Sequence, residues 1–293
     1  MKSFSTAFTV FRNALQGFGQ HNMTTYAAAL AYQVLFSLFP FILFLVALLG
    51  FLGIPEFFSW LQGQATSLLP TQAAEQVNAV IGQLRQPQGG LLSFGIVLAL
   101  WSASGGVRAV MGAMNAAYGV REGRPAWKLY LLSLLYTLGL ALLLIAAAAL
   151  MIVGPQAVAW LDARIGLGGV VVTLWNLLRW PLIIVLLTLS IALIYYLTPD
   201  VEQRFRLITP GTLLAVLVWL AASFGFGYYV QNFADYNATY GSLGAIIILL
   251  FYFYLSAAIL LFGAELNATL EHRRTGHKNP GGKDPGDKAL PES

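Results

Sequence analysis

The sequence of 293 residues has no cysteine, three histidines and few charged residues, which make up 10% of the chain. Without cysteine there is no disulfide, no thiolate metal ligand and no thiol nucleophile. His21, His272 and His277 lie outside the long apolar stretches, so we expect no buried metal site and no histidine relay. Soluble domains carry about 25% charged residues, so this chain is not expected to be a water-soluble globule.

Motifs of catalysis and nucleotide binding are also missing. The sequence shows no spacing typical of a Ser-His-Asp triad, no phosphate-binding glycine loop and no HExxH helix. We therefore expect no enzymatic activity, no metal and no cofactor. It also has no basic groove with interleaved aromatic residues, so we expect no nucleic-acid partner.

Apolar residues are abundant instead, at 58% of the chain, and mean hydropathy is +0.72. The ~30 Å hydrocarbon core of a bilayer takes about 20 helical residues to cross. Six stretches are long enough: residues 27–53, 91–114, 130–153, 174–197, 209–231 and 242–265. The sequence predicts an all-α fold, a polytopic membrane helix bundle with six transmembrane helices.

The fourth of these stretches has the least regular surroundings. Gly154-Pro155 is expected to end the third helix, and Arg179-Trp-Pro181 interrupts the apolar residues that precede the fourth. We therefore interpret residues 156–178 as a partly extramembrane or re-entrant lead-in to the fourth helix.

Lysine and arginine are distributed unevenly between the two sides of such a bundle. With the N-terminus inside, three fall on the outer side, Arg85, Arg164 and Arg179. The inner side holds Lys2, Arg12, Arg121, Arg124, Lys128, Arg204, Arg206, Arg273, Arg274, Lys278, Lys283 and Lys288. Positive charge concentrates on the cytoplasmic side of membrane proteins. The sequence therefore predicts cytoplasmic N and C termini, and this asymmetry explains the net charge of +4.

The segments outside the spans suggest three further parts. Residues 1–26 are a cytoplasmic amphipathic lead-in, in which residues 4–20 suit either a helix lying in the membrane interface or a simple approach to the first span. Within the transmembrane domain, 27–270, the outer loop 54–90 is expected to form amphipathic interfacial helices. Residues 271–293 lack apolar periodicity and are expected to be a disordered cytoplasmic tail.

Ionisable residues within the spans are the first candidates for function, because each costs ~2.5–3.5 kcal/mol at the helix centre on insertion scales. Arg108 follows a run of small residues that includes Gly105 and Gly106, where another backbone can approach closely. Glu265 lies at a similar depth, so the two residues could form a pair. The alternative is that Arg108 reaches the headgroups and Glu265 sits in the interface.

The first span contains a proline near its middle. Pro40 removes one backbone hydrogen bond and is expected to kink the helix. Tyr32, Gln33 and Ser37 lie close to it at helical spacing, so the bend could line a pathway. Ordinary helix packing is the alternative, because neighbouring helices can satisfy the freed backbone groups.

A tyrosine-rich connection lies between the fifth and sixth spans, on the outer side. It includes Asp235 and Tyr240, which suit the rim of a cavity, although an aspartate in a turn more often caps backbone groups. The candidate substrate-binding residues are Tyr32, Gln33, Ser37, Arg108, Asn115, Asp235, Tyr240 and Glu265. The candidate structural residues are Pro40, Gly105, Gly106 and Gly241.

Several stretches, in order, resemble the YihY/BrkB family of bacterial inner-membrane proteins. They are Tyr26-Ala-Ala-Ala-Leu-Ala-Tyr-Gln-Val-Leu-Phe-Ser-Leu-Phe-Pro40, Trp101-Ser-Ala-Ser-Gly-Gly-Val-Arg108 with Asn115-Ala-Ala-Tyr118, Tyr195-Tyr-Leu-Thr-Pro-Asp200 with Pro210-Gly211, and Tyr240-Gly-Ser-Leu-Gly-Ala through Leu261-Phe-Gly-Ala-Glu-Leu-Asn267. The resemblance implies six helices and a multi-pass inner-membrane location. It implies no settled activity: members were formerly labelled ribonuclease BN, and others are associated with envelope integrity, serum resistance and export of a lipid A precursor.

The sequence and the resemblance together favour a transporter or flippase-like protein for a lipid or other amphipathic substrate in envelope biogenesis. The expected partners are membrane lipids, with envelope proteins as possible partners. The alternatives are a scaffold protein of an envelope complex and a small-solute or ion transporter, and ribonuclease activity ranks last. Oligomeric state does not follow from the sequence.

Overall fold

The computed structural model describes residues 2–51, 62–63, 89–165, 169–233 and 242–275. Within them the secondary structure is helical, and the long helices are α1 (Lys2–Gln20), α2 (Met23–Phe51), α5 (Gly89–Ala117), α6 (Ala126–Ile165), α7 (Gly169–Leu197), α8 (Pro210–Phe233) and α10 (Ser242–Thr275). All but α1 are long and apolar enough to cross a membrane, which gives six candidate spans. The predicted all-α fold with six membrane helices is confirmed.

The chain divides into two compact units, which we describe separately. The main unit comprises residues 1–32 and 106–293, and the second unit comprises residues 33–105. The division falls inside α2 and inside α5, so each of these helices contributes to both units.

The core of the main unit is built largely from small side chains. Alanines of α2, α5, α8 and α10 are buried there together with Met23, Met114 and Leu261. At Gly211, a β-carbon would collide with the carbonyl oxygen of Gly263, so the backbones of α8 and α10 touch at this crossing. Small residues allow such close approach between membrane helices, where dispersion rather than water exclusion drives packing. The outward faces are apolar, as the exposed Phe224 of α8 illustrates, and suit contact with lipid.

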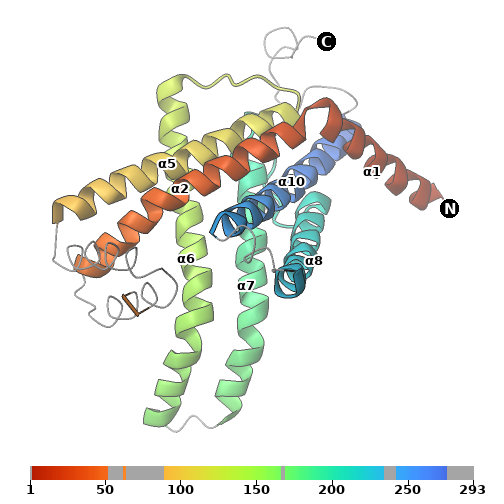
Figure 1. Ribbon diagram of the computed structural model, residues 1–293. Helices are drawn as coiled ribbons and strands as arrows, with labels where there is room; N and C mark the ends of the chain where they lie inside the picture. Colours follow the sequence, from red (N-terminus) through yellow and green to blue (C-terminus); the bar gives the residue numbers. More distant parts are fainter. Residues whose placement is uncertain (1, 52–61, 64–88, 166–168, 234–241, 276–293) are drawn as a thin grey trace. The chain divides into compact units, whose positions relative to one another are not determined.

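Helix α1 is a separate element that packs on α10 (Figure 1). Val10 and Ala14 are buried against Leu266, and the ring of Phe11 lies edge-on to that of Phe262 with centroids 5.5 Å apart. Other apolar side chains of α1 are exposed, including that of Phe8. One apolar face thus contacts protein while others are open, which favours the interfacial-helix interpretation over a simple lead-in.

Contrary to the prediction, residues 156–178 do not form a separate lead-in to the fourth helix, although residues 156–165 do lie beyond the third candidate span, Ala126–Met151. Helix α6 continues through Gly154 and Pro155 to Ile165, and α7 already begins at Gly169. Proline removes a single helical hydrogen bond, and here α7 packs alongside α6 and supports the helix past it. Gly154 lies directly against the indole ring of Trp175, where any larger residue would push the two helices apart.

Other predicted boundaries shift by a few residues or fall outside the described part of the chain. Helix α2 begins at Met23, and α10 extends to Thr275, so its last turn takes in residues 271–275 of the expected tail. Most of the expected outer loop 54–90 and the tail from 276 onward lie outside the described residues, as do Asp235, Tyr240 and Gly241.

Candidate functional site

A network of polar side chains, which we call the clamp, joins the end of α5 to two connections of the main unit. The Asn115 side-chain amide donates to Glu122 Oε2 at 2.9 Å, and the backbone N–H of Asp200 donates to Asn115 Oδ1 at 2.7 Å. Arg124 binds both Glu122 oxygens, at 2.7 and 2.9 Å, and donates to the Thr198 carbonyl at 2.8 Å. The α5–α6 connection is thereby fixed to the α7–α8 connection.

The charge of Glu122 is stabilised by this network. Burial raises the pKa of its carboxyl, but the hydrogen bonds from Arg124, the Arg124 charge and the Asn115 amide together outweigh burial and lower it. Glu122 is therefore held as a carboxylate, which keeps it an acceptor for both partners.

A second set of hydrogen bonds supports the start of the α7–α8 connection. Gln203 donates to the carbonyl oxygens of Tyr195 and Tyr196, at 2.6 and 3.2 Å, and accepts from the Tyr118 hydroxyl at 3.4 Å. The buried Tyr195 hydroxyl donates to the Leu260 carbonyl of α10 at 2.7 Å. Burial, and then the nearby charges of Glu271 and Glu265, raise the pKa of Tyr118, so its hydroxyl keeps its proton.

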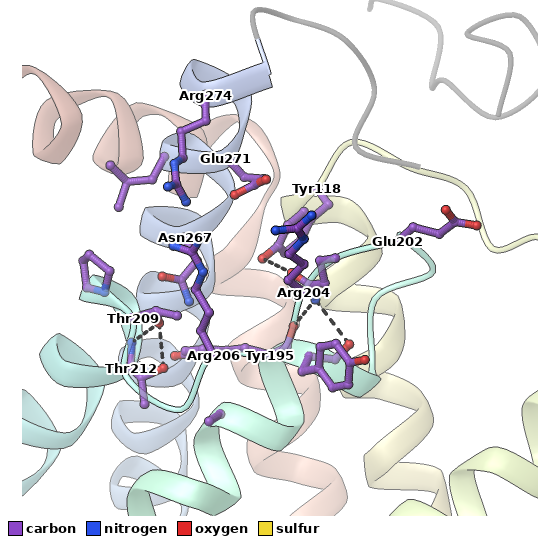
Figure 2. Close-up of a pocket in the computed structure, with 15 residues that line it drawn as sticks. Tyr118, Tyr195, Glu202, Arg204, Arg206, Thr209, Thr212, Asn267, Glu271 and Arg274 are labelled. Atoms are coloured by element: carbon purple, nitrogen blue, oxygen red, sulfur yellow. Dashed lines mark hydrogen bonds between the residues drawn. The ribbon is translucent and has the colours of Figure 1, made fainter. Parts of the chain in front are cut away.

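These supports surround a cavity of about 700 Å³ between the α7–α8 connection and the ends of α5, α7, α8 and α10. Figure 2 shows that the connection and α10 present charged side chains to the same space. The cavity is lined by Tyr118, Ala192, Tyr195, Tyr196, Glu202, Gln203, Arg204, Arg206, Thr209, Pro210, Thr212, Asn267, Leu270, Glu271 and Arg274.

The cavity is electropositive on balance, because three arginines and two glutamates line it. Within the described part of the chain, no hydrogen bond or ion pair engages Arg204, Arg206 or Arg274. The first turn of α8 also lines the cavity, through Pro210 and Thr212. Its first backbone N–H groups are already engaged, because Gly211 donates to Asn267 Oδ1 at 2.9 Å and Thr212 donates to Thr209 Oγ1 at 3.1 Å. The arginines are therefore the groups that suit this end of the bundle to an anion.

Arg108 and Glu265 do not form the pair that seemed possible from the sequence. Arg108 donates to Ser133 Oγ at 3.1 Å and lies 4.4 Å from the centre of the Tyr130 ring, so it ties α5 to α6. Glu265 instead lies 2.7 Å from His21 Nδ1. Each residue thus has a different partner, Ser133 for Arg108 and His21 for Glu265. Neither Arg108 nor Glu265 lines the cavity.

The residues predicted around Pro40 are satisfied locally. Ser37 donates to the carbonyl of Val34, one turn earlier, at 2.8 Å, and Gln33 donates to the Ser102 carbonyl at 3.0 Å. Tyr32 is 62% exposed, and Pro40 lies inside a continuous α2. These hydrogen bonds are of the kind expected from ordinary helix packing, and none of these side chains lines the cavity of about 700 Å³ or the small apolar cavity beside Leu135.

Among the predicted binding residues that the structure describes, Asn115 alone acts next to the cavity, as a member of the clamp. The arginines of the cavity were counted in the sequence only as cytoplasmic charges. The usable signals were the polar motif ending at Asp200 and Pro210-Gly211, which bracket Glu202, Arg204 and Arg206. No group of three or more His, Asp or Glu side chains that could hold a metal ion occurs in the described ranges.

Six membrane-length helices define a polytopic α-helical membrane protein. The family described as "Virulence factor BrkB" matches residues 14–287, and the chain belongs to this family. The resemblance seen in the sequence motifs is confirmed.

Relatives agree with this assignment. YfkH of Bacillus subtilis (strain 168), whose name calls it ribonuclease-like, is 34% identical over 87% of this chain and 92% of its own length. UPF0761 membrane proteins of Ralstonia nicotianae and Rhodospirillum centenum are each 30% identical over 91% and 92% of this chain. The chain spans only 59% of the length of each of these two proteins. No solved structure matches the chain.

Proposed function

We propose that this chain is a transporter or flippase-like protein of the bacterial inner membrane, and that its cavity receives the headgroup of an anionic amphipathic lipid. The observation that carries the proposal is the trio of arginines, Arg204, Arg206 and Arg274, that line a cavity of about 700 Å³ and have no hydrogen-bond or ion-pair partner among the residues that the structure describes. Ligand pockets usually measure about 300–1,000 Å³, so a lipid headgroup is of suitable size.

The chemistry of the lining supports an anion that also carries hydrogen-bond acceptors. Guanidinium groups bind phosphate and carboxylate with paired, charge-assisted hydrogen bonds. Glu202 and Glu271 on the same lining offer places for hydroxyl or amine groups of the headgroup.

The α7–α8 connection also suits contact with acyl chains. Its sequence alternates charge and apolar bulk, since the exposed side chains of Phe205, Leu207 and Ile208 follow Arg204 and flank Arg206. A polar cavity beside exposed apolar side chains matches the two halves of an amphipathic molecule. The distribution of lysine and arginine supports an orientation in which this end faces the cytoplasm, so the substrate would enter from the inner leaflet.

A scaffold in an envelope complex is the alternative. The proposal treats the chain as non-enzymatic, and it does not extend the ribonuclease-like name of YfkH to this chain. The scaffold alternative needs no cavity chemistry, so removing the three arginine charges separates the two functions.

The test is lipid movement in vesicles that contain the purified protein. The rate at which a fluorescent anionic phospholipid crosses the bilayer is compared between the wild type and the triple variant Arg204→Gln, Arg206→Gln, Arg274→Gln. The control variant, Arg121→Gln, Lys128→Gln, Arg273→Gln, removes three exposed charges of the same end that do not line the cavity.

We expect the cavity variant to be at least about tenfold slower, because losing one charge-assisted hydrogen bond alone is worth ~1.5–3 kcal/mol. The control should retain the wild-type rate. Equal rates in the two variants would contradict the cavity assignment. An absence of protein-dependent movement for every anionic and zwitterionic lipid tested would favour the scaffold.

A further inference from the structure

Glu265 is a buried carboxylate whose partner is a histidine on a distant part of the chain. Its side chain is 2% exposed, and its Oε1 lies 2.7 Å from Nδ1 of His21, whose side chain is 32% exposed. His21 occupies the turn between α1 and α2, where Asn22 has a positive φ of 54°. The contact therefore joins this turn to the middle of the buried face of α10.

The backbone around the pair is shaped to bring these groups together. A β-carbon at Gly17 would come within 2.7 Å of Glu265 Oε2, so the glycine lets α1 lie against the carboxylate in its present position. The backbone N–H of His21 donates to the Gly17 carbonyl at 2.8 Å. This bond forms the last turn at the end of α1, next to the His21–Glu265 pair. The imidazole remains partly exposed to solvent, so a proton can reach it directly.

The charge of the pair depends on one proton. When His21 is protonated, its imidazolium and the Glu265 carboxylate together carry no net charge. When His21 is neutral, the buried negative charge of Glu265 remains uncompensated, which is unfavourable. The hydrogen bond to Glu265 raises the pKa of His21, burial lowers it, and the Glu265 charge raises it further. The net pKa is raised.

Other ionisable groups lie on the elements around the pair. After Glu265, α10 carries Glu271, His272, Arg273 and Arg274; α1 carries Lys2 and Arg12; and Tyr26 and Tyr118 lie near the start of α2 and after α5. Arg12 is exposed. Tyr118 feels the charges of both Glu271 and Glu265 and lines the cavity with Glu271, so the pair lies within electrostatic reach of the cavity.

We propose that His21 and Glu265 form a proton-binding site that clasps α1 to α10 and links proton occupancy to the wall of the cavity. The residues of α10 that follow Glu265, namely Asn267, Leu270, Glu271 and Arg274, form that wall. When the proton leaves His21 for solvent, the uncompensated carboxylate favours separation of the α1–α2 turn from α10. The claim that this proton is the coupling ion of transport rests on the proposed function, whereas the clasp between α1 and α10 does not.

The sign follows from the raised pKa of His21. The contribution of the pair to the clasped state is complete below the ordinary histidine pKa and is lost as pH rises through the raised value. We therefore expect α1 to be held at acid and neutral pH and released in alkaline solution.

The clasp can be measured with spin labels, because the chain has no cysteine and single cysteines can be placed at will. Labels at Leu15 on α1 and Arg273 on α10, both exposed, report the separation of the two helices in lipid nanodiscs. We expect a narrow distance distribution at low pH that broadens or lengthens as pH rises beyond the ordinary histidine value near 6.5, because the pKa of His21 is raised. In Glu265→Gln and in His21→Gln the distribution should not change with pH.

The proton itself is followed by nitrogen NMR of histidine in a background with His272→Asn and His277→Asn, which leaves His21 as the one histidine. We expect Glu265→Gln to weaken proton binding at His21 at least about tenfold, equivalent to one pKa unit. An unchanged His21 titration in Glu265→Gln, or a wild-type distance that does not follow that titration, would overturn the proposal.

The vesicle assay, repeated across pH, keeps this inference separate from the proposed function. A pH-dependent clasp with no lipid movement at any pH would contradict the proposed function and retain the proton site. Lipid movement that stays the same across the titration of His21, and equal in Glu265→Gln, would contradict the coupling and retain the transport function.

Discussion

The segment of α2 around Pro40 and the cavity at the α7–α8 connection both place polar side chains among apolar helices, but they differ in what those side chains contact. In α2, Ser37 bonds to its own helix and Gln33 to a carbonyl of α5. At the cavity, the clamp and the bonds between Gln203 and the tyrosines are satisfied polar groups. They support arginines that have no protein partner among the described residues. A satisfied polar group stabilises the fold, whereas a supported but unpaired charge is available to a ligand.

The largest effect should come from filling the helix crossing behind the cavity. In Gly211→Ala the new methyl group meets the backbone of Gly263, which cannot move without separating α8 from α10. We expect a loss of about 3 kcal/mol or more in the free energy of unfolding, measured by denaturation in detergent. Gly225→Ala on the same helix has open space and should be neutral or slightly stabilising; an equal loss there would remove the close-contact explanation.

The clamp should come next. Asn115→Ala leaves the Glu122 carboxylate and the Asp200 N–H without this partner, and we expect ~2–3 kcal/mol of destabilisation because buried polar groups lose their hydrogen bonds. The matched control is Asn176→Ala on the exposed face of α7, which should change stability little. If both variants unfold alike, the clamp does not support the cavity.

A single arginine of the cavity should affect binding rather than folding. Arg206→Gln should weaken binding of a short-chain anionic lipid about tenfold, equivalent to ~1.4 kcal/mol, by removing one charge-assisted contact. Calorimetric titration measures the affinity, and Arg121→Gln serves as the control. A change in unfolding free energy without a change in affinity would reassign Arg206 to structure.

The pH dependence of stability should reveal the contribution of the Glu122 carboxylate, the negative charge of the clamp. Because the Glu122 pKa is lowered in the folded protein from its ordinary value of 4.5, its contribution is present above that value and is lost as pH falls through the folded pKa. Thermal unfolding followed from neutral to acid pH should therefore decline less steeply in Glu122→Gln than in the wild type. The difference should be smaller than the effect of Asn115→Ala, since the Glu122 side chain is 28% exposed whereas Asn115 is buried.

The smallest effect should lie in α2. Ser37→Ala removes a bond within one helix turn and should change the unfolding free energy by less than ~0.5 kcal/mol and leave lipid movement unchanged. A substantial loss of lipid movement in Ser37→Ala, at unaltered stability, would return the pathway to α2.

The course of the chain through the membrane follows from elements visible in the sequence. Six long apolar stretches have no stable alternative to membrane helices, so α2, α5, α6, α7, α8 and α10 were predictable. Pro155 led to a wrong predicted end of the third helix. A proline ends an isolated helix in water more readily than it ends a helix that packs against a neighbour, as α6 packs against α7. Arg108 and Glu265 were rightly singled out as costly residues, but their partners, Ser133 and His21, depend on helix rotation, which apolar spans do not encode. The cavity was not predictable, since it is formed by a connection whose arginines look the same as any cytoplasmic charges.

Photocrosslinking of an anionic lipid tests the central claim most directly. A phosphatidic acid with a photoreactive group near its phosphate is activated in nanodiscs, and the attachment sites are mapped by mass spectrometry. We predict adducts on the α7–α8 connection and on residues 267–274 of α10, lost when Arg204, Arg206 and Arg274 are all replaced by glutamine. Adducts concentrated on residues 32–40 of α2, or unchanged by that replacement, would contradict the account.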